Sequence, residues 1–285
     1  MNRTRTIGAL TVALCFGMLA LAGCTKGGGE NTVQVKGSDT LLHLSTEWAE
    51  AFMKGSADIE VTVTGGGSGT GISALLNGTC DVANASRKIK EEEKENAEKK
   101  GLEIKEFTVA RDGISVIVHP GNPVDTITME QLKKIFTGQY DNWKSVGGPD
   151  LAIVVLSRDH SSGTHAYFKK RVLEKKEYVQ SARFLASNSA IVASVKEDAG
   201  AIGYVGLGYY EDAKGDVKAL AVKDGEADPV GPSLETVTSG AYPISRTLQV
   251  YTAGEPEGVV KTYIDFILGE AGQKIVAAKG FVPVE

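Results

Sequence analysis

Hydrophobic and polar positions along the chain follow two periods that alternate. Thr32 to Lys36 alternates between apolar and polar side chains, as a half-buried strand does, and Leu41, Leu44, Trp48 and Phe52 then recur at helical spacing. The same change of period continues through the first half of the chain. It predicts strands over 59–64, 80–86, 104–108 and 113–118, and helices over 72–76, 88–100 and 128–136.

The second half of the chain continues this alternation. We expect strands over 151–156, 200–208 and 248–251, and helices over 164–173, 178–184, 192–195 and 257–278. Residues 119–123 and 211–240 are expected to be loops, because turn-forming and polar side chains dominate them. Strands that alternate with helices in this way indicate an α/β fold with mostly parallel sheets.

The first 23 residues have the features of an export signal. Arg3 and Arg5 precede an apolar stretch over 7–22 that is too short to span a membrane as a helix. The stretch ends in Leu21-Ala-Gly-Cys24, which resembles the lipobox of bacterial lipoproteins. This resemblance implies cleavage before Cys24 and acylation of that cysteine, palmitate included; the alternative is an ordinary signal peptide. Residues 24–31, polar and rich in glycine, are expected to be a flexible tether between the membrane and the folded chain.

The composition limits the partners of the exported chain. The full sequence has 31 basic and 36 acidic residues, and loss of the two arginines in the signal changes the net charge from −5 to −7. Such a surface does not favour nucleic acid or anionic lipid, so an anion has to be bound by a local site. Cys15 is lost with the signal and Cys24 is expected to be lipidated, which leaves Cys80 without a disulfide partner. The remaining residues are enough for two lobes or one large α/β unit.

The densest group of anion-binding side chains is Ser157-Arg-Asp-His-Ser-Ser-Gly-Thr164. It joins the expected strand at 151–156 to the expected helix at 164–173. Its backbone N–H groups therefore lie at a helix amino terminus, which carries partial positive charge. Arg158 adds a permanently charged, bidentate donor suited to phosphate-like groups. The alternative for this stretch alone is an ordinary helix cap beside a surface arginine.

Two further turns between a strand and a helix have a similar composition, at Ser38 to Thr40 and at Ser68 to Gly71. Parallel α/β sheets place such turns together at the carboxyl ends of their strands, where ligands usually bind. A tetrahedral oxyanion needs many donors around four oxygens, and hydroxyls with helix amino termini supply them with little bulk. The three turns together predict a site for such an anion.

The glycine-rich stretch Gly65 to Gly71 lacks residues that other functions require. A nucleotide P-loop needs lysine where Ile72 stands. A dinucleotide fingerprint and a hydrolase nucleophile elbow both need glycine where Thr70 stands. These three functions are therefore not favoured, and no cofactor is expected.

Histidine and serine leave two weaker alternatives. His160 and His165 have no further His or Cys cluster beside them, so a metal site is not expected. A phosphoesterase or serine hydrolase would use Ser68 or Ser162 as nucleophile, with His160 as base for Ser162. This stays the enzyme alternative to a binding protein.

Six segments carry a resemblance to one family, which extends over essentially all of residues 32–285. They are Gly37-Ser-Asp-Thr-Leu41, Gly65-Gly-Gly-Ser-Gly-Thr-Gly71, Asp81-Val-Ala-Asn-Ala-Ser-Arg87, Arg111-Asp-Gly-Ile114, Ser157-Arg-Asp-His-Ser-Ser-Gly-Thr164 and Gly200-Ala-Ile-Gly-Tyr-Val205. The chain resembles the substrate-binding lipoproteins of bacterial phosphate ABC transporters. The Arg-x-x-x-Ser-Gly-Thr block is highly specific to them.

The resemblance implies a type II periplasmic-binding-protein fold with two lobes and two hinge strands. Lobe 1 would comprise 32–112 and 241–285, and lobe 2 would comprise 113–240. Inorganic phosphate would bind between the lobes, without catalysis, metal or cofactor, and pass to ABC permease subunits; the chain would be a monomer. The residues that map to the phosphate site are Ser38, Thr40, Leu41 (by its backbone N–H) and Ser68 in lobe 1, and Arg158, Ser162, Gly163 and Thr164 in lobe 2.

One position departs from the family pattern. Many relatives have an aspartate after the Ala-Ser of the segment that begins at Asp81, where it accepts a hydrogen bond from protonated phosphate, and this chain has Arg87. Such a carboxylate rejects fully ionised sulfate, because an unpaired acceptor that faces another oxyanion is repulsive. Ser86 and Arg87 stay candidate ligands, and Asp39 or Asp159 is the candidate acceptor. Sulfate, molybdate and tungstate remain alternative ligands.

Overall fold

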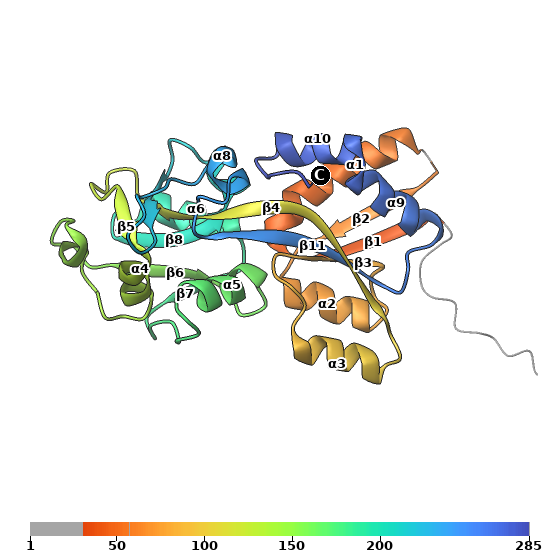
Figure 1. Cartoon of the computed structure of the whole chain (residues 1–285), viewed down its shortest axis with the longest axis horizontal. Helices are drawn as coiled ribbons and strands as arrows, with labels where there is room; N and C mark the ends of the chain where they lie inside the picture. Colours follow the sequence, from red (N-terminus) through yellow and green to blue (C-terminus); the bar gives the residue numbers. More distant parts are fainter. Residues whose placement is uncertain (1–30, 57, 285) are drawn as a thin grey trace, which may run out of the picture.

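The structure is a computed structural model that describes residues 31–56 and 58–284. It has two lobes, joined by the long strands β4 (Ile104–Val118) and β11 (Ser245–Ala253), which cross the middle of the molecule (Figure 1). The predicted signal at 1–23 and Cys24 lie outside the described residues, as does the tether apart from Asn31. Within 31–56 and 58–284, no helix is long and apolar enough to cross a membrane.

Lobe 1 contains both ends of the described chain. Its strands are β1 (Thr32–Gly37), β2 (Glu60–Thr64) and β3 (Val82–Ala85), and its helices are η1 (Asp39–Leu41), α1 (Leu42–Gly55), α2 (Ser68–Leu76), α3 (Glu91–Lys99), α9 (Gly258–Leu268) and α10 (Glu270–Ala278). The alternating residues Val33 and Val35 of β1 are buried in one core with Trp48 and Phe52 of α1, as their spacing predicts. The Trp48 indole N–H donates to the Gly272 carbonyl over 2.9 Å, which ties α1 to α10.

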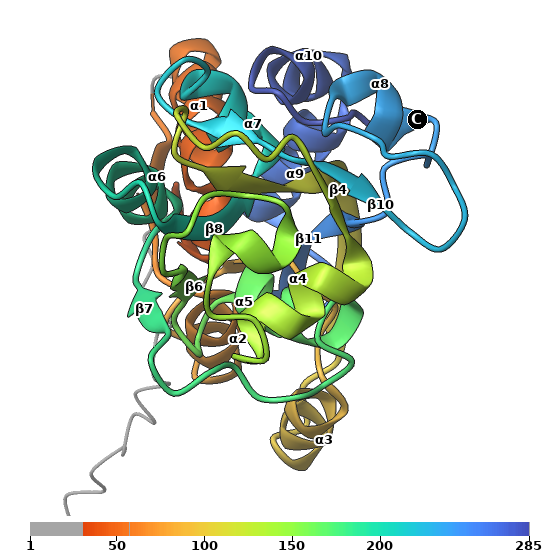
Figure 2. The same ribbon diagram turned by 90° about the vertical axis from the view of Figure 1, so that its left-hand side faces the viewer.

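Lobe 2 has helices on both faces of its part of the sheet. Its strands are β5 (Thr126–Thr128), β6 (Val154–Arg158), β7 (Arg183–Leu185), β8 (Ala201–Gly206), β9 (Lys218–Ala219) and β10 (Ala221–Lys223). Its helices are α4 (Met129–Phe136), η2 (Trp143–Val146), α5 (Gly163–Arg171), α6 (Asn188–Glu197), α7 (Leu207–Asp212) and α8 (Leu234–Thr238). In β8, Tyr204 packs with Phe136 and Phe168 of α4 and α5, whereas Val205 packs with Ile191 of α6. Successive strand residues point to opposite faces, so β8 lies between these helices (Figure 2).

The two lobes share one nine-stranded sheet with the order β2-β1-β3-β11-β4-β8-β6-β7, and β9 also pairs with β4. β4 pairs antiparallel with β11 as far as Gly113, which lies opposite Ser245. From Ile114 onward β4 pairs with β8, where Ile114 lies opposite Gly206. The pairing is parallel among β1, β2 and β3 and among β6, β7 and β8. The predicted α/β class with mostly parallel sheets in each lobe and two connecting strands is confirmed.

Five sequence predictions are wrong in detail. The strand at 200–208 ends at Gly206, because Leu207 begins α7. The strands at 104–108 and 113–118 are one strand, β4, because the residues between them stay paired with β11. Residues 178–184 are not a helix; residues 183–185 form β7, an edge strand whose pairing with β6 overrides local propensity. The region 211–240 contains β9, β10 and α8 besides loops. The helix at 257–278 is two helices, because Gly269 has an extended backbone between α9 and α10.

Candidate functional site

Four buried hydroxyl groups from both lobes meet where the lobes touch. Thr40 lies in η1, Ser68 begins α2, Ser86 follows β3 and Thr164 lies in the first turn of α5, and each residue is at most 1% exposed. Thr40 Oγ1 lies 2.9 Å from Thr164 Oγ1, and Thr164 Oγ1 lies 3.5 Å from Ser86 Oγ. Ser86 Oγ lies 3.4 Å from Ser68 Oγ. The three predicted turns therefore converge, and Ser86 joins them.

The amino termini of two helices also meet at this point. Ser162 precedes α5, and its Oγ accepts the backbone N–H groups of Thr164 and His165 over 3.2 and 3.3 Å. α2 begins at Ser68 without a side-chain cap. A Cβ atom added at Gly163 would lie only 2.3 Å from Ser68 Oγ, so the first turn of α5 lies directly against α2. Two partially positive helix ends thus border the hydroxyl groups.

Arg158 ends β6 and is 1% exposed. Its Nε donates to the Leu185 carbonyl over 3.3 Å and its Nη2 donates to the Ala186 carbonyl over 2.8 Å. Its Nη1 lies 3.2 Å from Asp39 Oδ2 but makes no hydrogen bond. Burial lowers the pKa of Arg158, and the nearby Asp39 charge opposes that shift. The guanidinium is therefore held by the protein with one buried donor still available.

Three other predicted residues have protein partners in this structure. Ser38 is buried, and its carbonyl accepts the Leu41 N–H over 3.0 Å, so that N–H is used within its own turn. The Arg87 guanidinium binds both carboxylate oxygens of Glu93, on α3, over 2.8 and 2.7 Å. The Arg87 stem nevertheless reaches the contact between the lobes, since a Cβ at Gly163 would lie 3.1 Å from Arg87 Cγ.

A buried ion pair on the hinge strands was missed by the sequence prediction. Arg246 of β11 donates from Nε and Nη2 to Asp112 Oδ2 of β4 over 3.1 and 2.8 Å, and these side chains are 1% and 0% exposed. Arg246 also donates from Nη1 to the Ser86 carbonyl and from Nη2 to Thr40 Oγ1, over 2.9 and 3.4 Å. The pair therefore supports two of the hydroxyl-bearing segments. Asp112 lies in a segment that carries the family resemblance, whereas no sequence signal indicated Arg246.

Three ion pairs border the site. Arg158 faces Asp39, Arg246 faces Asp112 and Arg87 faces Glu93. These three pairs sum to no net charge. An anion between the lobes would therefore be bound through N–H and O–H dipoles and not through an excess of positive charge.

The geometry around the serines does not resemble a hydrolase. Ser162 Oγ caps α5, and Ser68 Oγ accepts the Ser86 N–H over 3.0 Å. The His160 ring packs against His165 and Phe184. Among the residues that the structure describes, neither serine has a hydrogen bond to an imidazole, and no group of three or more His, Cys, Asp or Glu could hold a metal.

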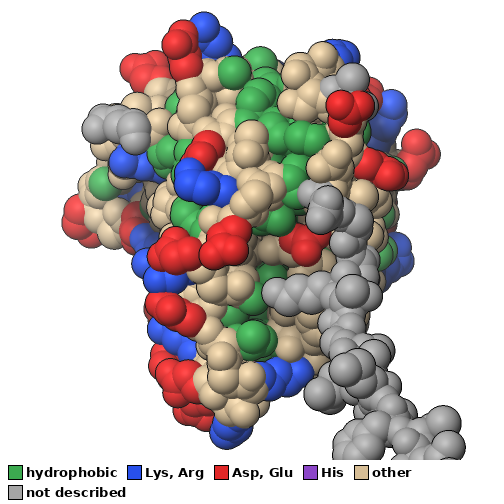
Figure 3. Space-filling model, turned by 90° about the vertical axis from the view of Figure 1, so that its right-hand side faces the viewer, with side chains coloured by type: hydrophobic (Ala, Val, Ile, Leu, Met, Phe, Trp, Pro, Cys, Tyr) green, Lys and Arg blue, Asp and Glu red, His purple; other side chains and the backbone are tan. Residues whose placement is uncertain are grey.

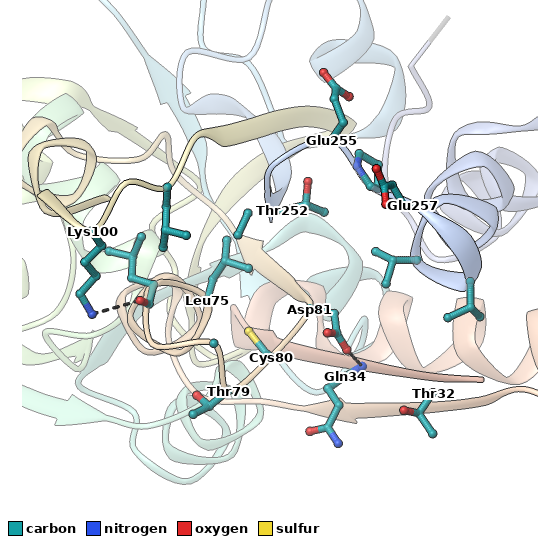
Figure 4. A pocket seen from close by; sticks show the side chains of 17 residues that line it. Thr32, Gln34, Leu75, Thr79, Cys80, Asp81, Lys100, Thr252, Glu255 and Glu257 are labelled. Atoms are coloured by element: carbon teal, nitrogen blue, oxygen red, sulfur yellow. Dashed lines mark hydrogen bonds between the residues drawn. The ribbon is translucent and has the colours of Figure 1, made fainter. Parts of the chain in front are cut away.

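A separate groove of about 560 Å³ lies on lobe 1 (Figure 4). Leu75, Cys80, Asp81 and Thr252 are among its lining residues, and none of the predicted phosphate ligands is. Burial raises the pKa of Cys80 to about 12, with Asp81 adding to the shift, so its side chain is a neutral thiol. The outer end of lobe 1 has acidic and basic side chains interspersed around an apolar stretch (Figure 3). The groove is therefore distinct from the predicted phosphate site.

Known proteins are similar to this chain in sequence and in architecture. The profile of the PBP superfamily domain matches residues 24–271. The protein SphX of Synechococcus elongatus is 37% identical over 261 residues, which cover 88% of this chain and 77% of that protein. The phosphate-binding protein PstS of Staphylococcus saprophyticus is 35% identical over 276 residues, which cover 93% of this chain and 86% of that protein. The chain belongs to the PstS family of phosphate-binding proteins.

A solved structure of the same family has the same fold. A substrate-binding protein from Clostridium perfringens, assigned to phosphate ABC transport and solved with bound phosphate, superposes with a TM-score of 0.82 at 34% identity. The match covers 90% of this chain and 100% of that one. The predicted two-lobed periplasmic-binding-protein fold and the family resemblance are confirmed.

Proposed function

We propose that this chain binds inorganic phosphate between its lobes and delivers it to an ABC permease for import. The observation that carries this proposal is the convergence of four buried hydroxyls, those of Thr40, Ser68, Ser86 and Thr164, near the partly free guanidinium of Arg158. Hydroxyl groups that now contact one another can turn their O–H groups toward the oxygens of an anion. We also assign Ser38, Leu41, Ser162 and Gly163 to the site. In this structure the N–H groups of Ser38, Leu41 and Ser162 donate to the Asn84, Ser38 and Asp159 carbonyls, and the Arg87 stem lies beside Gly163.

Carboxylate groups close to the site favour phosphate over sulfate. Because the three ion pairs sum to no net charge, hydrogen bonds decide which anion is retained. Asp39 adjoins Thr40 in the chain, and Asp112 shares Arg246 with Thr40. Carboxylate acceptors so close to the site favour an anion that carries a proton, as hydrogen phosphate does at neutral pH, and disfavour sulfate, molybdate and tungstate.

The remaining sequence predictions complete the proposal. The chain is exported, acylated with palmitate at Cys24 and anchored by that lipid to the cell membrane, where it faces the periplasm or the cell exterior. It is a monomer that catalyses no reaction. Lobe 1 comprises residues 32–112 and 241–285, and lobe 2 comprises residues 113–240. The change of β4 partner between Gly113 and Ile114 supports the first boundary.

Calorimetric titration of the purified chain with phosphate and with sulfate tests the ligand. We expect heat for one phosphate per chain and none for sulfate. Thr164→Val keeps the side-chain shape but removes a hydroxyl, and a hydrogen bond to a charged ligand contributes about 1.5–3 kcal/mol, so the Kd should rise about 10- to 150-fold. Thr46→Val, at an exposed hydroxyl that only bonds its own helix, is the matched control.

Two outcomes would contradict this function. Tight sulfate binding without phosphate heat would show a receptor for another oxyanion. Turnover of a chromogenic phosphoester that is lost in Ser162→Ala would show an enzyme.

A further inference from the structure

Asp39 belongs to lobe 1, yet groups of lobe 2 hold both its side chain and its backbone. Its Oδ2 accepts the backbone N–H of Asn188 over 2.8 Å and the Asn188 side-chain amide over 2.6 Å. The same oxygen lies 3.2 Å from Arg158 Nη1. The Tyr209 hydroxyl donates to the Asp39 carbonyl over 2.8 Å. Asp39 is 7% exposed and Asn188 is fully buried, so these contacts are shielded from water.

The position of Asn188 makes the contact with the carboxylate favourable. Asn188 is the first residue of α6, and Ser187 caps that helix by accepting the Ala190 N–H over 3.1 Å. The Asp39 carboxylate therefore lies at the partially positive end of a ten-residue helix of the other lobe, beside a guanidinium. The Asp39 carboxylate of lobe 1 thus binds Asn188 and lies beside Arg158, both on lobe 2.

These contacts exist only while the lobes are together. If the lobes separate, Asp39 moves with η1, whereas Arg158, Asn188 and Tyr209 move with lobe 2. Asp159 offers a contrast, because its Oδ1 accepts the N–H and the Oγ of Ser161 within the same turn, over 2.8 and 2.6 Å. Separation of the lobes would leave the contacts of Asp159 intact.

We propose that Asp39 is an interlobe latch, a positioning residue that stabilises the closed form whether or not an anion is bound. A group that raises the closed fraction before the ligand arrives lowers the apparent Kd and slows release. The expected effect on the Kd rests on the proposed phosphate function, whereas the effect of Asp39 on closure of the lobes does not. The opposing interpretation is that Asp39 only repels the bound anion from Arg158, and this predicts that its removal tightens binding.

The latch is tested by measuring the distance between the lobes without phosphate. Nitroxide labels at Lys99→Cys on α3 and Lys170→Cys on α5 occupy exposed positions, one on each lobe. A chain that starts at Thr25 keeps every described residue, and the buried Cys80 thiol, whose pKa is about 12, is protected from labelling. Electron–electron double resonance then gives the populations at short and long distance.

We expect the closed-to-open ratio to fall about tenfold in Asp39→Ala, equivalent to about 1.4 kcal/mol, and less in Asp39→Asn. Asn188→Ala, which removes a partner from the other lobe, should act in the same direction. Asp150→Asn, at an exposed carboxylate held within lobe 2 by Asn142 and Lys144, should leave the distance distribution as in the wild type. An unchanged distribution in Asp39→Ala with an unchanged melting temperature would overturn the latch.

Phosphate release provides the second measurement. Stopped-flow dissociation should be about tenfold faster in Asp39→Ala than in the wild type, with a higher Kd. Tighter phosphate binding by Asp39→Ala would refute the latch in favour of repulsion. If the wild type gives no heat with phosphate, the proposed function fails, while the distance measurement still decides whether the latch exists.

Discussion

Gly67 offers a way to separate closure of the lobes from the chemistry of the site. It precedes α2 on lobe 1, and a Cβ atom added there would lie 2.3 Å from the Ser161 carbonyl oxygen and 2.4 Å from its carbon, on lobe 2. Backbone atoms cannot rotate away, so Ser161 would have to move by about 1 Å to reach an ordinary contact of ~3.5 Å. The nearby hydrogen bond from Gly69 N–H to the Ser161 carbonyl, now 3.0 Å, would be lost.

The cost of this methyl group falls on the closed form alone. Gly67 has φ of −125° and ψ of 163°, which alanine adopts without strain, so lobe 1 itself tolerates the change. Overpacking typically costs about 1–3 kcal/mol. At about 1.4 kcal/mol per tenfold change, Gly67→Ala should raise the Kd for phosphate about 5- to 150-fold.

The assay is calorimetric titration with phosphate, accompanied by thermal unfolding of the chain without phosphate. Gly231→Ala is the matched control, because a Cβ there meets no atom within 4 Å. We expect the control to bind as the wild type does and both variants to remain folded. Wild-type affinity in Gly67→Ala would show that the chain binds phosphate without bringing the lobes into this contact, which would refute the reasoning.

Three other predictions follow from the buried charges. Arg158→Ala leaves Asp39 without its cation and removes a donor, so the Kd for phosphate should rise at least about 30-fold, as for loss of about 2–5 kcal/mol; near-normal affinity in the titration would place Arg158 outside the site. Asp112→Ala leaves Arg246 buried and unpaired, and urea unfolding should show a loss of about 3–5 kcal/mol, whereas a loss below 1 kcal/mol would contradict the pairing. Burial, assisted by His160, lowers the pKa of His165 from 6.5 to about 4, so the unfolded chain takes up the proton first and stability should fall as the pH drops from about 6.5 to 4. In His165→Gln, the free energy of unfolding in urea should fall less between about pH 6.5 and 4 than in the wild type. An equal fall in both chains would argue against the lowered pKa of His165.

Local patterns were sufficient for several elements and for the type of chemistry. The apolar spacing of Leu44, Trp48 and Phe52 predicted α1, because a helix has to bury one face. The Ser162-Gly163-Thr164 sequence predicted the start of α5, since a serine before the first turn can cap free N–H groups. Small hydroxyl residues at three such turns indicated an anion. Each of these inferences depends on residues within a few positions of one another.

Other features were decided by contacts between distant segments. Tyr178 and Phe184 did not form the predicted helix, because their rings pack around His165 and residues 183–185 pair with β6. Likewise, nothing in the local sequence distinguishes Arg246 from a surface arginine, and Asp112, its partner, is 134 residues away.

The amino-acid sequence by itself determined the periods of the elements, the caps, the charge balance and the family motifs. Only the tertiary structure decided that Thr40 meets Thr164, 124 residues along the chain, and that Asp39 meets Asn188, 149 residues along. The reason is physical: these pairs depend on how β4 and β11 bring the lobes together. A short stretch of sequence carries no signal for the partner that a distant segment presents.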